Sequence, residues 1–473
     1  MLVGMGLAML RVALVNAPLG YDESVYASET RSFVTGVPTL WAIYRPPGLP
    51  LVGLTALPLG LSDASLRIAA AACGLLALGL VWGLARLLWG RLAAGIALVV
   101  VMVSPVVLDQ IVVFHNDAPS AAPVLALMVL LWWQFEVRER PNALLVAAGP
   151  LAAAAFYLRY GALALLVGVA LTAIFLWGKR LLRAARLVGA SLVVTVALFL
   201  PHIVDAVIRT GSPLGIVRAA VTQVDTTTPL HAALQYLRWM PSQLAGIAGV
   251  VFVVVAGLAA AYAAAESIGG RRLTAPARRL VWLLLPAVVA GLGTVIVSHP
   301  EARYVLTPVV LVEIAGAGSA ATAVVWLAKR LAQTQPRAAS LVVPAILVVL
   351  VVVLALDGRS WIRREVRHKG DQWLLHAGRA IATNAGGPCT LASSIGPILG
   401  WYSGCAPITF VDPTNARMPA QSGRPVYVVF TTLDDTRGVK PQVLARYRNE
   451  LNLVEIANFG QDPLVATVYR VQP

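Results

Sequence analysis

Residues 16–50 read NAPLGYDESVYASETRSFVTGVPTLWAIYRPPGLP and separate two runs apolar enough to be membrane spans. The segment carries the adjacent acids Asp22 and Glu23, a stretch with helical potential, and then Arg45 before two prolines. Ionisable groups beside a membrane are costly and tend to be functional. We therefore expect this loop to be central to what the chain does.

The composition places the whole chain in the membrane class. Of its 473 residues, 58% are hydrophobic and 12% are charged, whereas soluble domains have roughly 45–50% apolar and about 25% charged residues. The net charge of +15 comes from basic residues gathered in short clusters between apolar runs. That is the positive-inside pattern of cytoplasmic loops rather than a nucleic-acid-binding surface.

The spacing of the apolar runs predicts a polytopic α-helical membrane protein with about 11 transmembrane helices. We expect the protein to lie in the plasma or inner membrane, with its N-terminus in the cytoplasm. The expected spans are residues 2–16, 62–89, 92–108, 118–135, 143–157, 162–177, 187–204, 242–263, 280–297, 304–327 and 341–356.

Because each span reverses the side of the membrane, counting the spans from a cytoplasmic N-terminus places every polar junction of interest on the outer face. These junctions are loop 17–50, residues 109–119, 159–161, 205–241 and 298–303, and the tail after residue 357. One-sided placement is what a catalytic or binding chamber at the outer leaflet would produce. The alternative is that outer loops merely hold the polar residues that remain once Lys and Arg are sorted inward.

The composition changes abruptly at the tail, which divides the chain into a transmembrane domain, residues 1–357, and an extracytoplasmic α/β domain, residues 358–473. The short apolar runs PCTLASS, APITFVD, PVYVVFTT, LVEIANF and LVATVYRV predict strands, and DQWLLHAGRAIATN and KPQVLARYRNEL predict amphipathic helices. Cys389 and Cys405 are expected to form a disulfide in an oxidising compartment, whereas Cys73 lies in a span.

The candidate catalytic and binding residues include two adjacent acids and three arginines. A carboxylate at Asp22 or Glu23 can accept a proton from an acceptor, although both residues also suit the first turn of a helix. Arg45, Arg159 and Arg303 stand at separate outer junctions, where the planar guanidinium fork suits a phosphate. The alternative for each arginine is snorkelling or pairing with an acid such as Glu301.

Asp117, in FHNDAP, is either a helix N-cap or a second carboxylate that faces the Asp22 site. His115 and His299 could join Asp22, Glu23 or Asp117 around a divalent cation, but regular ligand spacing is missing. We therefore assign no metal ligands and no certain cofactor, and a divalent cation stays open as an alternative.

The motifs, in this order and topology, resemble the GT-C glycosyltransferases related to protein O-mannosyltransferases and to the aminoarabinose transferase of lipid A. They are YDE after the first span, Arg45 with Pro46, DAP before the fourth span, RYG after the fifth, and Arg303 with Tyr304 before the tenth. The resemblance covers residues 2 to about 357.

The resemblance implies an integral-membrane enzyme that moves a sugar from a polyprenyl-phosphate donor to an acceptor outside the cytoplasm. Asp22 would match the catalytic base and Glu23 its neighbouring acid. Asp117 would match the second loop acid. The donor phosphate would be bound by Arg45, Arg159, Arg303 and Tyr304.

Two departures from the family pattern leave the acceptor open as lipid, glycan or protein. The tail segments PCTLASS and GWYSGC cannot be tied to any acceptor. The loop 205–241 lacks the MIR-type insertion of eukaryotic protein mannosyltransferases.

A single displacement with inversion at the anomeric carbon is the expected mechanism, because the lipid phosphate is already a good leaving group. Two rival classes remain: a transporter or flippase of lipid-linked sugars without chemistry, and an assembly scaffold that uses the tail. The sequence shows neither an internal repeat nor a matching pair of broken spans, which transporters often have.

Overall fold

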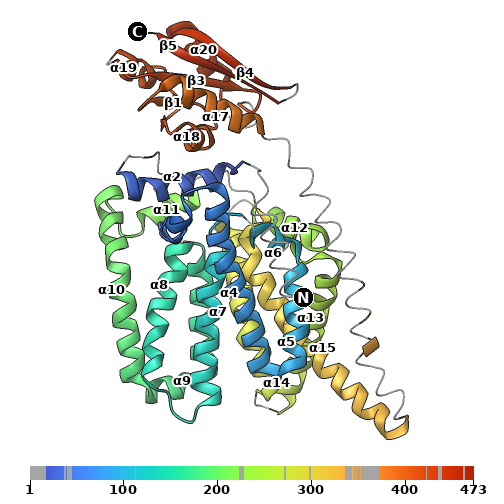
Figure 1. Ribbon diagram of the computed structural model, residues 1–473. Coiled ribbons are helices and arrows are strands. Elements are labelled where there is room, and N and C mark those ends of the chain that lie inside the picture. Colours follow the sequence, from blue (N-terminus) through green and yellow to red (C-terminus); the bar gives the residue numbers. More distant parts are fainter. Residues whose placement is uncertain are drawn as a thin grey trace.

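The computed structural model describes residues 18–36, 39, 45–111, 113–222, 228–270, 273–297, 300–335, 372–421, 423–434, 439–461 and 464–472, with isolated positions at 344–345, 348 and 352. A helical bundle forms one part of the molecule, and a small sheet domain lies over one end of it, next to α2 (Figure 1).

Helices account for the described part of the bundle. Their bounds are α2 (Tyr21–Thr35), α3 (Gly48–Gly53), η1 (Leu54–Leu59), α4 (Asp63–Trp89), α5 (Arg91–Val103), α6 (Pro105–Ile111), α7 (Asp117–Trp132), η2 (Trp133–Val137), η3 (Ala143–Ala147), α8 (Ala148–Leu158), α9 (Ala162–Arg183), α10 (Ala185–Thr210), α11 (Gly215–Thr222), α12 (Pro229–Trp239), η4 (Met240–Leu244), α13 (Gly246–Gly270), α14 (Ala275–Val297), η5 (Ala302–Val305) and α15 (Leu306–Thr334).

Seven of the described helices are long and apolar enough to cross a membrane, or eight if α5 and α6, which are bent by 70°, form one span. A shorter apolar helix covers Ala143–Leu158. Together these nine elements match nine of the predicted spans. The other two, residues 2–16 and 341–356, lie outside the described residues apart from isolated positions, so the total of about 11 stays a prediction.

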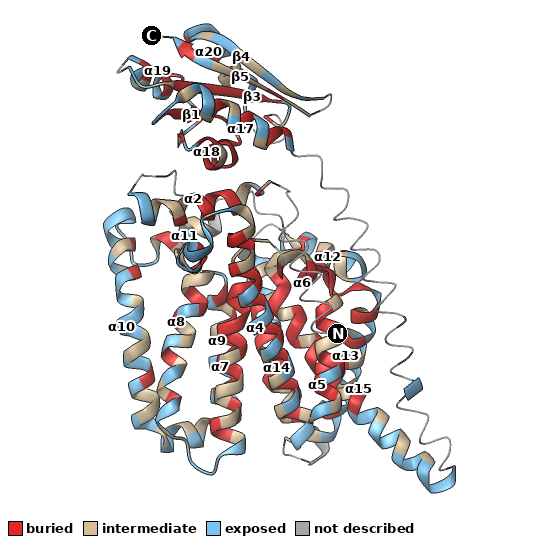
Figure 2. Ribbon diagram, in the orientation of Figure 1, coloured by how far each residue is buried: buried red, intermediate tan, exposed pale blue. Residues whose placement is uncertain are grey.

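The polytopic helical class is confirmed by where the apolar side chains lie. Helix α10 illustrates it, because only 11% of its most apolar stretch is buried inside the protein (Figure 2). Leu192, Val193 and Val196 on this helix are each about 60% exposed or more. Apolar surface on this scale is not tolerated in water but suits lipid.

The tail forms a five-stranded sheet with the order β2-β1-β3-β5-β4. β1 pairs in parallel with β2 and β3, whereas β5 pairs antiparallel with β3 and β4. The bounds are β1 (Thr390–Ala392), β2 (Ala406–Ile408), β3 (Val426–Thr431), β4 (Asn452–Gln461) and β5 (Leu464–Gln472), with helices α17 (Gln372–Ala385), α18 (Gly396–Ser403), α19 (Thr414–Gln421) and α20 (Pro441–Glu450).

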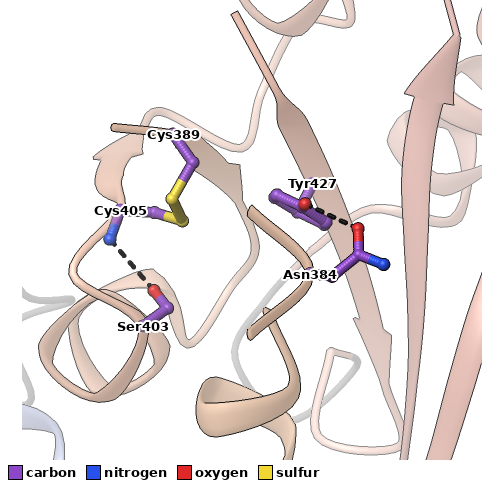
Figure 3. The surroundings of a disulfide bond; sticks show 5 residues. All are labelled: Asn384, Cys389, Ser403, Cys405 and Tyr427. Carbon is purple, nitrogen blue, oxygen red and sulfur yellow. Dashed lines mark hydrogen bonds between the residues drawn. A yellow bond between two sulfur atoms is a disulfide. The ribbon is translucent and has the colours of Figure 1, made fainter. Parts of the chain in front are cut away.

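Every strand and helix predicted for the tail is therefore present, but α18 and α19 were not predicted. Helix α18 lies inside the segment between Cys389 and Cys405, which are joined by a disulfide (Figure 3). Most of α18 is buried on all sides. Because the helix has no solvent-facing stripe, its sequence shows no helical alternation of apolar and polar residues.

Candidate active site at the α2 end of the bundle

Helix α2 holds the first acidic pair because the local sequence starts and stops it clearly. The carboxylate of Glu23 accepts a hydrogen bond from the backbone N–H of Gly20 (2.8 Å) at the start of the helix, where negative charge is favoured. The helix ends at Gly36, whose φ of 68° suits a residue without a side chain. The Thr30 hydroxyl donates to the carbonyl of Pro50 (3.2 Å) and ties α2 to α3.

The carboxylate of Asp22 is held between two arginines that are distant in sequence. Arg45 donates to its Oδ1 (2.5 Å), and Arg303, at the start of the last described span, donates to its Oδ2 (2.7 Å). All three side chains are only 14–21% exposed. Both carboxylate oxygens of Asp22 therefore face guanidinium groups.

The position of Arg45 depends on the tight packing of the segment that follows it. Pro47 precedes α3, and a side chain at Gly48 would come within 2.5 Å of the backbone carbonyl of Tyr157 on α8. Only glycine lets the two backbones approach this closely. The guanidinium of Arg45 also lies over the ring of Tyr26 (5.3 Å to the ring centre).

A second acid and the third arginine lie beside this group. Asp117, in the first turn of α7 and 1% exposed, is ion-paired with Arg159 at the end of α8. Arg159 also donates to the backbone carbonyl of Arg303 (3.2 Å). Tyr304 faces both guanidiniums, with its ring centre 5.0 Å from Arg159 and 5.5 Å from Arg303.

The fold thus brings together residues from four separate outer junctions of the predicted topology. Arg303 also pairs with Glu301 (2.5 Å), which is the pairing that the alternative interpretation expected, but it contacts Asp22 at the same time. Three arginines face three carboxylates in this cluster: Arg45, Arg159 and Arg303 with Asp22, Asp117 and Glu301. Their charges cancel when all are ionised.

Glu23 points away from this cluster and into a buried clamp. Arg67 of α4 donates to both of its oxygens (3.1 and 3.0 Å), and the backbone N–H of Phe114 donates to it as well (2.8 Å). Glu23 is 4% exposed and Arg67 6%. Arg67 was missed in the sequence, although a guanidinium within the predicted span 62–89 is costly and could have marked it.

The arginines set the ionisation of the two adjacent acids. Burial by itself raises the pKa of Asp22, but the guanidiniums of Arg45 and Arg303 outweigh it and hold that pKa well below its usual value. For Glu23, burial is likewise outweighed by Arg67, and the pKa is lowered. Both acids are therefore anionic at neutral pH, and Asp22 is a weak base as long as both arginines contact it.

His115 lies near Asp22, Glu23 and Asp117, with its Nδ1 3.2 Å from Oε1 of Gln110. Burial and the charge of Arg303 lower the pKa of His115, which favours the neutral imidazole at pH 7. Among the described residues, no group of three or more His, Cys, Asp and Glu is arranged to hold a metal ion. His299, the other histidine considered for such a site, lies outside the described residues.

Comparisons with known proteins agree with this architecture. The family model described as dolichyl-phosphate-mannose-protein mannosyltransferase matches residues 44–204, about a third of the chain. This stretch contains Arg45, Asp117 and Arg159. No curated protein matches the sequence.

Two solved structures are similar over nearly the whole chain. ArnT from Cupriavidus metallidurans, bound to undecaprenyl phosphate, has a TM-score of 0.67 at 15% identity, covering 99% of this chain and 97% of ArnT. The oligosaccharyltransferase AglB from Archaeoglobus fulgidus, in complex with an inhibitory peptide and a dolichol-phosphate, has a TM-score of 0.60 at 13% identity, covering 96% and 72%. The resemblance indicated by the sequence is thus confirmed in fold, because the chain has the same fold as ArnT and AglB.

Proposed function

We propose that the protein is an integral-membrane glycosyltransferase that transfers a sugar from a polyprenyl-phosphate donor to an acceptor at the α2 end of the bundle. The observation that carries the proposal is the carboxylate of Asp22 held between Arg45 and Arg303. Two guanidiniums from distant parts of the chain converge on one anionic group beside a lipid-facing bundle. A phosphate attached to a lipid has the charge, the geometry and the location to take that place.

The same arrangement explains how the acid becomes a base. A donor phosphate that binds Arg45 and Arg303 competes with Asp22 for their N–H groups. Loss of these contacts, together with the added negative charge, raises the pKa of Asp22 toward the range in which a carboxylate accepts a proton efficiently. In this scheme the donor itself activates the base, so that an unoccupied site stays unreactive.

The reaction is a single displacement. The acceptor oxygen or nitrogen attacks the anomeric carbon as its proton passes to Asp22. The bond between that carbon and the phosphate oxygen breaks, and the electron pair leaves with the polyprenyl phosphate, whose charge Arg45 and Arg303 neutralise. This geometry inverts the configuration at the anomeric carbon.

The remaining candidate residues take supporting roles in this proposal. Asp117 and Arg159 hold the backbone carbonyl of Arg303 and the ring of Tyr304 in place. Glu23, which the sequence placed among the catalytic acids, is assigned a positioning role, because every contact it makes fixes the start of α2.

We also propose that residues 1–357 form the catalytic membrane domain and residues 358–473 an extracytoplasmic domain, with the chain in the plasma or inner membrane. The basic clusters between the spans support this orientation by the positive-inside rule. The disulfide between Cys389 and Cys405 supports an oxidising compartment for the tail.

The test is a transfer assay with purified protein in nanodiscs, a panel of radiolabelled polyprenyl-phosphate sugars, and membrane extract as the source of acceptor. Wild-type protein is expected to transfer label, and NMR of the product is expected to show inversion. The Arg45→Ala variant loses one charge-assisted hydrogen bond worth about 1.5–3 kcal/mol, so its Kd for undecaprenyl phosphate rises roughly 10- to 100-fold.

Two results would overturn the proposal. Retention of configuration in the product would exclude single displacement. Movement of labelled head groups across the bilayer, without transfer from any donor, would favour the flippase alternative and leave the comparisons as a statement about fold alone.

A further inference from the structure

Helix α18 of the tail reaches across to the helical bundle through two adjacent aromatic residues. Trp401 donates its indole N–H to Oδ1 of Asp63 (2.7 Å), and the Tyr402 hydroxyl donates to Oδ2 of the same carboxylate (2.6 Å). Asp63 is the first residue of α4. Both oxygens of one acid in the bundle are thus bound by the tail.

The same two residues also hold the chain that leads into α2. The Tyr402 hydroxyl accepts a hydrogen bond from the backbone N–H of Leu19 (2.6 Å), three residues before Asp22. Arg31 of α2 donates to the backbone carbonyl of Trp401 (2.9 Å) and lies over its indole ring, 3.9 Å from the ring centre. Trp401 and Leu19 are 4% and 1% exposed and share one apolar cluster.

These contacts converge on the start of α2 from two directions. Arg67, one turn beyond Asp63 on α4, donates to the carbonyl of Pro18 (3.1 Å) and to Glu23. The residues on either side of Asp22 are therefore held by contacts with α4 of the bundle and with α18 of the tail. A shift of α18 would move the backbone that carries Asp22 relative to Arg45 and Arg303.

The disulfide limits such a shift. It joins Cys389, which directly precedes β1, to Cys405, two residues after the end of α18. The Ser403 hydroxyl accepts a hydrogen bond from the backbone N–H of Cys405 (3.1 Å; Figure 3). The helix is thus anchored to the sheet at both ends of the closed segment.

We propose that Tyr402 and Trp401 are positioning residues that the tail supplies to the active site, and that they set the placement of Asp22 through Asp63 and the N–H of Leu19. The inference rests on the proposed function for its effect on turnover. The contacts themselves can be tested without any activity.

The experiment compares full-length wild type with Tyr402→Phe in nanodiscs. The variant keeps the ring but loses the hydroxyl. Hydrogen–deuterium exchange in the peptide that contains residues 19–24 is expected to become about tenfold faster, because the Leu19 N–H loses its acceptor. The kcat for sugar transfer is expected to fall about ten- to hundredfold, as for a small misplacement of a reacting group. The Kd for undecaprenyl phosphate is not expected to rise, because Arg45 and Arg303 are unchanged and a displaced Asp22 competes less with the phosphate.

Tyr427→Phe is the matched control. Tyr427 is buried in the same sheet domain, and its hydroxyl donates to Oδ1 of Asn384 on α17 (2.8 Å; Figure 3). This variant is expected to leave both exchange at residues 19–24 and kcat unchanged. Asp63→Asn is a second test and is expected to reproduce the exchange change of Tyr402→Phe.

The outcomes separate the two proposals. Unchanged exchange at residues 19–24 in Tyr402→Phe, or an equal change in Tyr427→Phe, would overturn the positioning role. Faster exchange with full kcat would overturn it as well. Faster exchange in a protein whose wild type transfers no sugar would uphold the contact and reject the glycosyltransferase function.

Discussion

Replacing Asp22 by Asn separates the contacts that this side chain makes with Arg45 and Arg303 from the base role that we propose for it. In the free protein its carboxylate occupies the N–H groups of Arg45 and Arg303. The proposed mechanism requires a donor phosphate to displace it and the released carboxylate to act as base. The variant should therefore bind phosphate more tightly and turn over more slowly.

The size of the effect follows from the contacts. Each hydrogen bond to a charged group contributes about 1.5–3 kcal/mol, and the single amide oxygen of Asn retains one of the two bonds from the arginines. The competition that phosphate must overcome at Arg45 and Arg303 thus falls by about 1.5–3 kcal/mol, or roughly 10- to 100-fold in Kd. Loss of the base should lower kcat by about 10²–10⁴.

The assay is equilibrium binding of undecaprenyl phosphate to nanodiscs that hold wild type or Asp22→Asn, with the transfer assay run in parallel. Asp205→Asn is the control, because Asp205 also pairs with an arginine, Arg209, but both are nearly half exposed and lie outside the cluster. Weaker binding of undecaprenyl phosphate by a folded Asp22→Asn protein would refute the competition between carboxylate and phosphate. Full turnover in that variant would refute the assignment of Asp22 as base.

Three further predictions concern stability. Arg67→Met should lower the free energy of unfolding by about 3–5 kcal/mol, because it leaves the charge of Glu23 buried without its partner. A thermal melt in detergent measures this loss, and an unchanged Tm would contradict the buried ion pair between Arg67 and Glu23. Reduction of the disulfide between Cys389 and Cys405, which closes a segment of 15 residues, should destabilise the tail by about 3 kcal/mol. Dithiothreitol should therefore lower the Tm of the wild type but leave the Tm of the Cys389→Ala, Cys405→Ala double variant unchanged. Because the folded-state pKa of Asp22 is lowered, the stability that its ionised carboxylate contributes is fully present above its unfolded pKa of about 3.8 and is lost as pH falls below that value. The Tm difference between wild type and Asp22→Asn should therefore be constant from pH 8 to about pH 5 and shrink near pH 3. A difference that changes between pH 8 and pH 6 would contradict the assignment.

Much of the fold could be predicted from the sequence because it depends on local patterns. Apolar runs of span length, basic clusters between them, and alternating runs in the tail each report their own segment's environment. The strands of the tail and nine of the expected spans lie where these patterns place them. The acids and arginines of the outer junctions also meet at one end of the bundle, as their topology predicted.

What the sequence by itself determined is therefore the membrane class, the gathering of the polar residues at one end of the bundle and the list of candidate groups. The tertiary structure alone decided how they are paired: Asp22 with Arg303, 281 residues away, and Glu23 with Arg67. It also decided that α18 reaches α2 through Tyr402, 383 residues from Leu19. Such pairings depend on how helices pack against each other rather than on the periodicity of any one of them, so no local pattern encodes them.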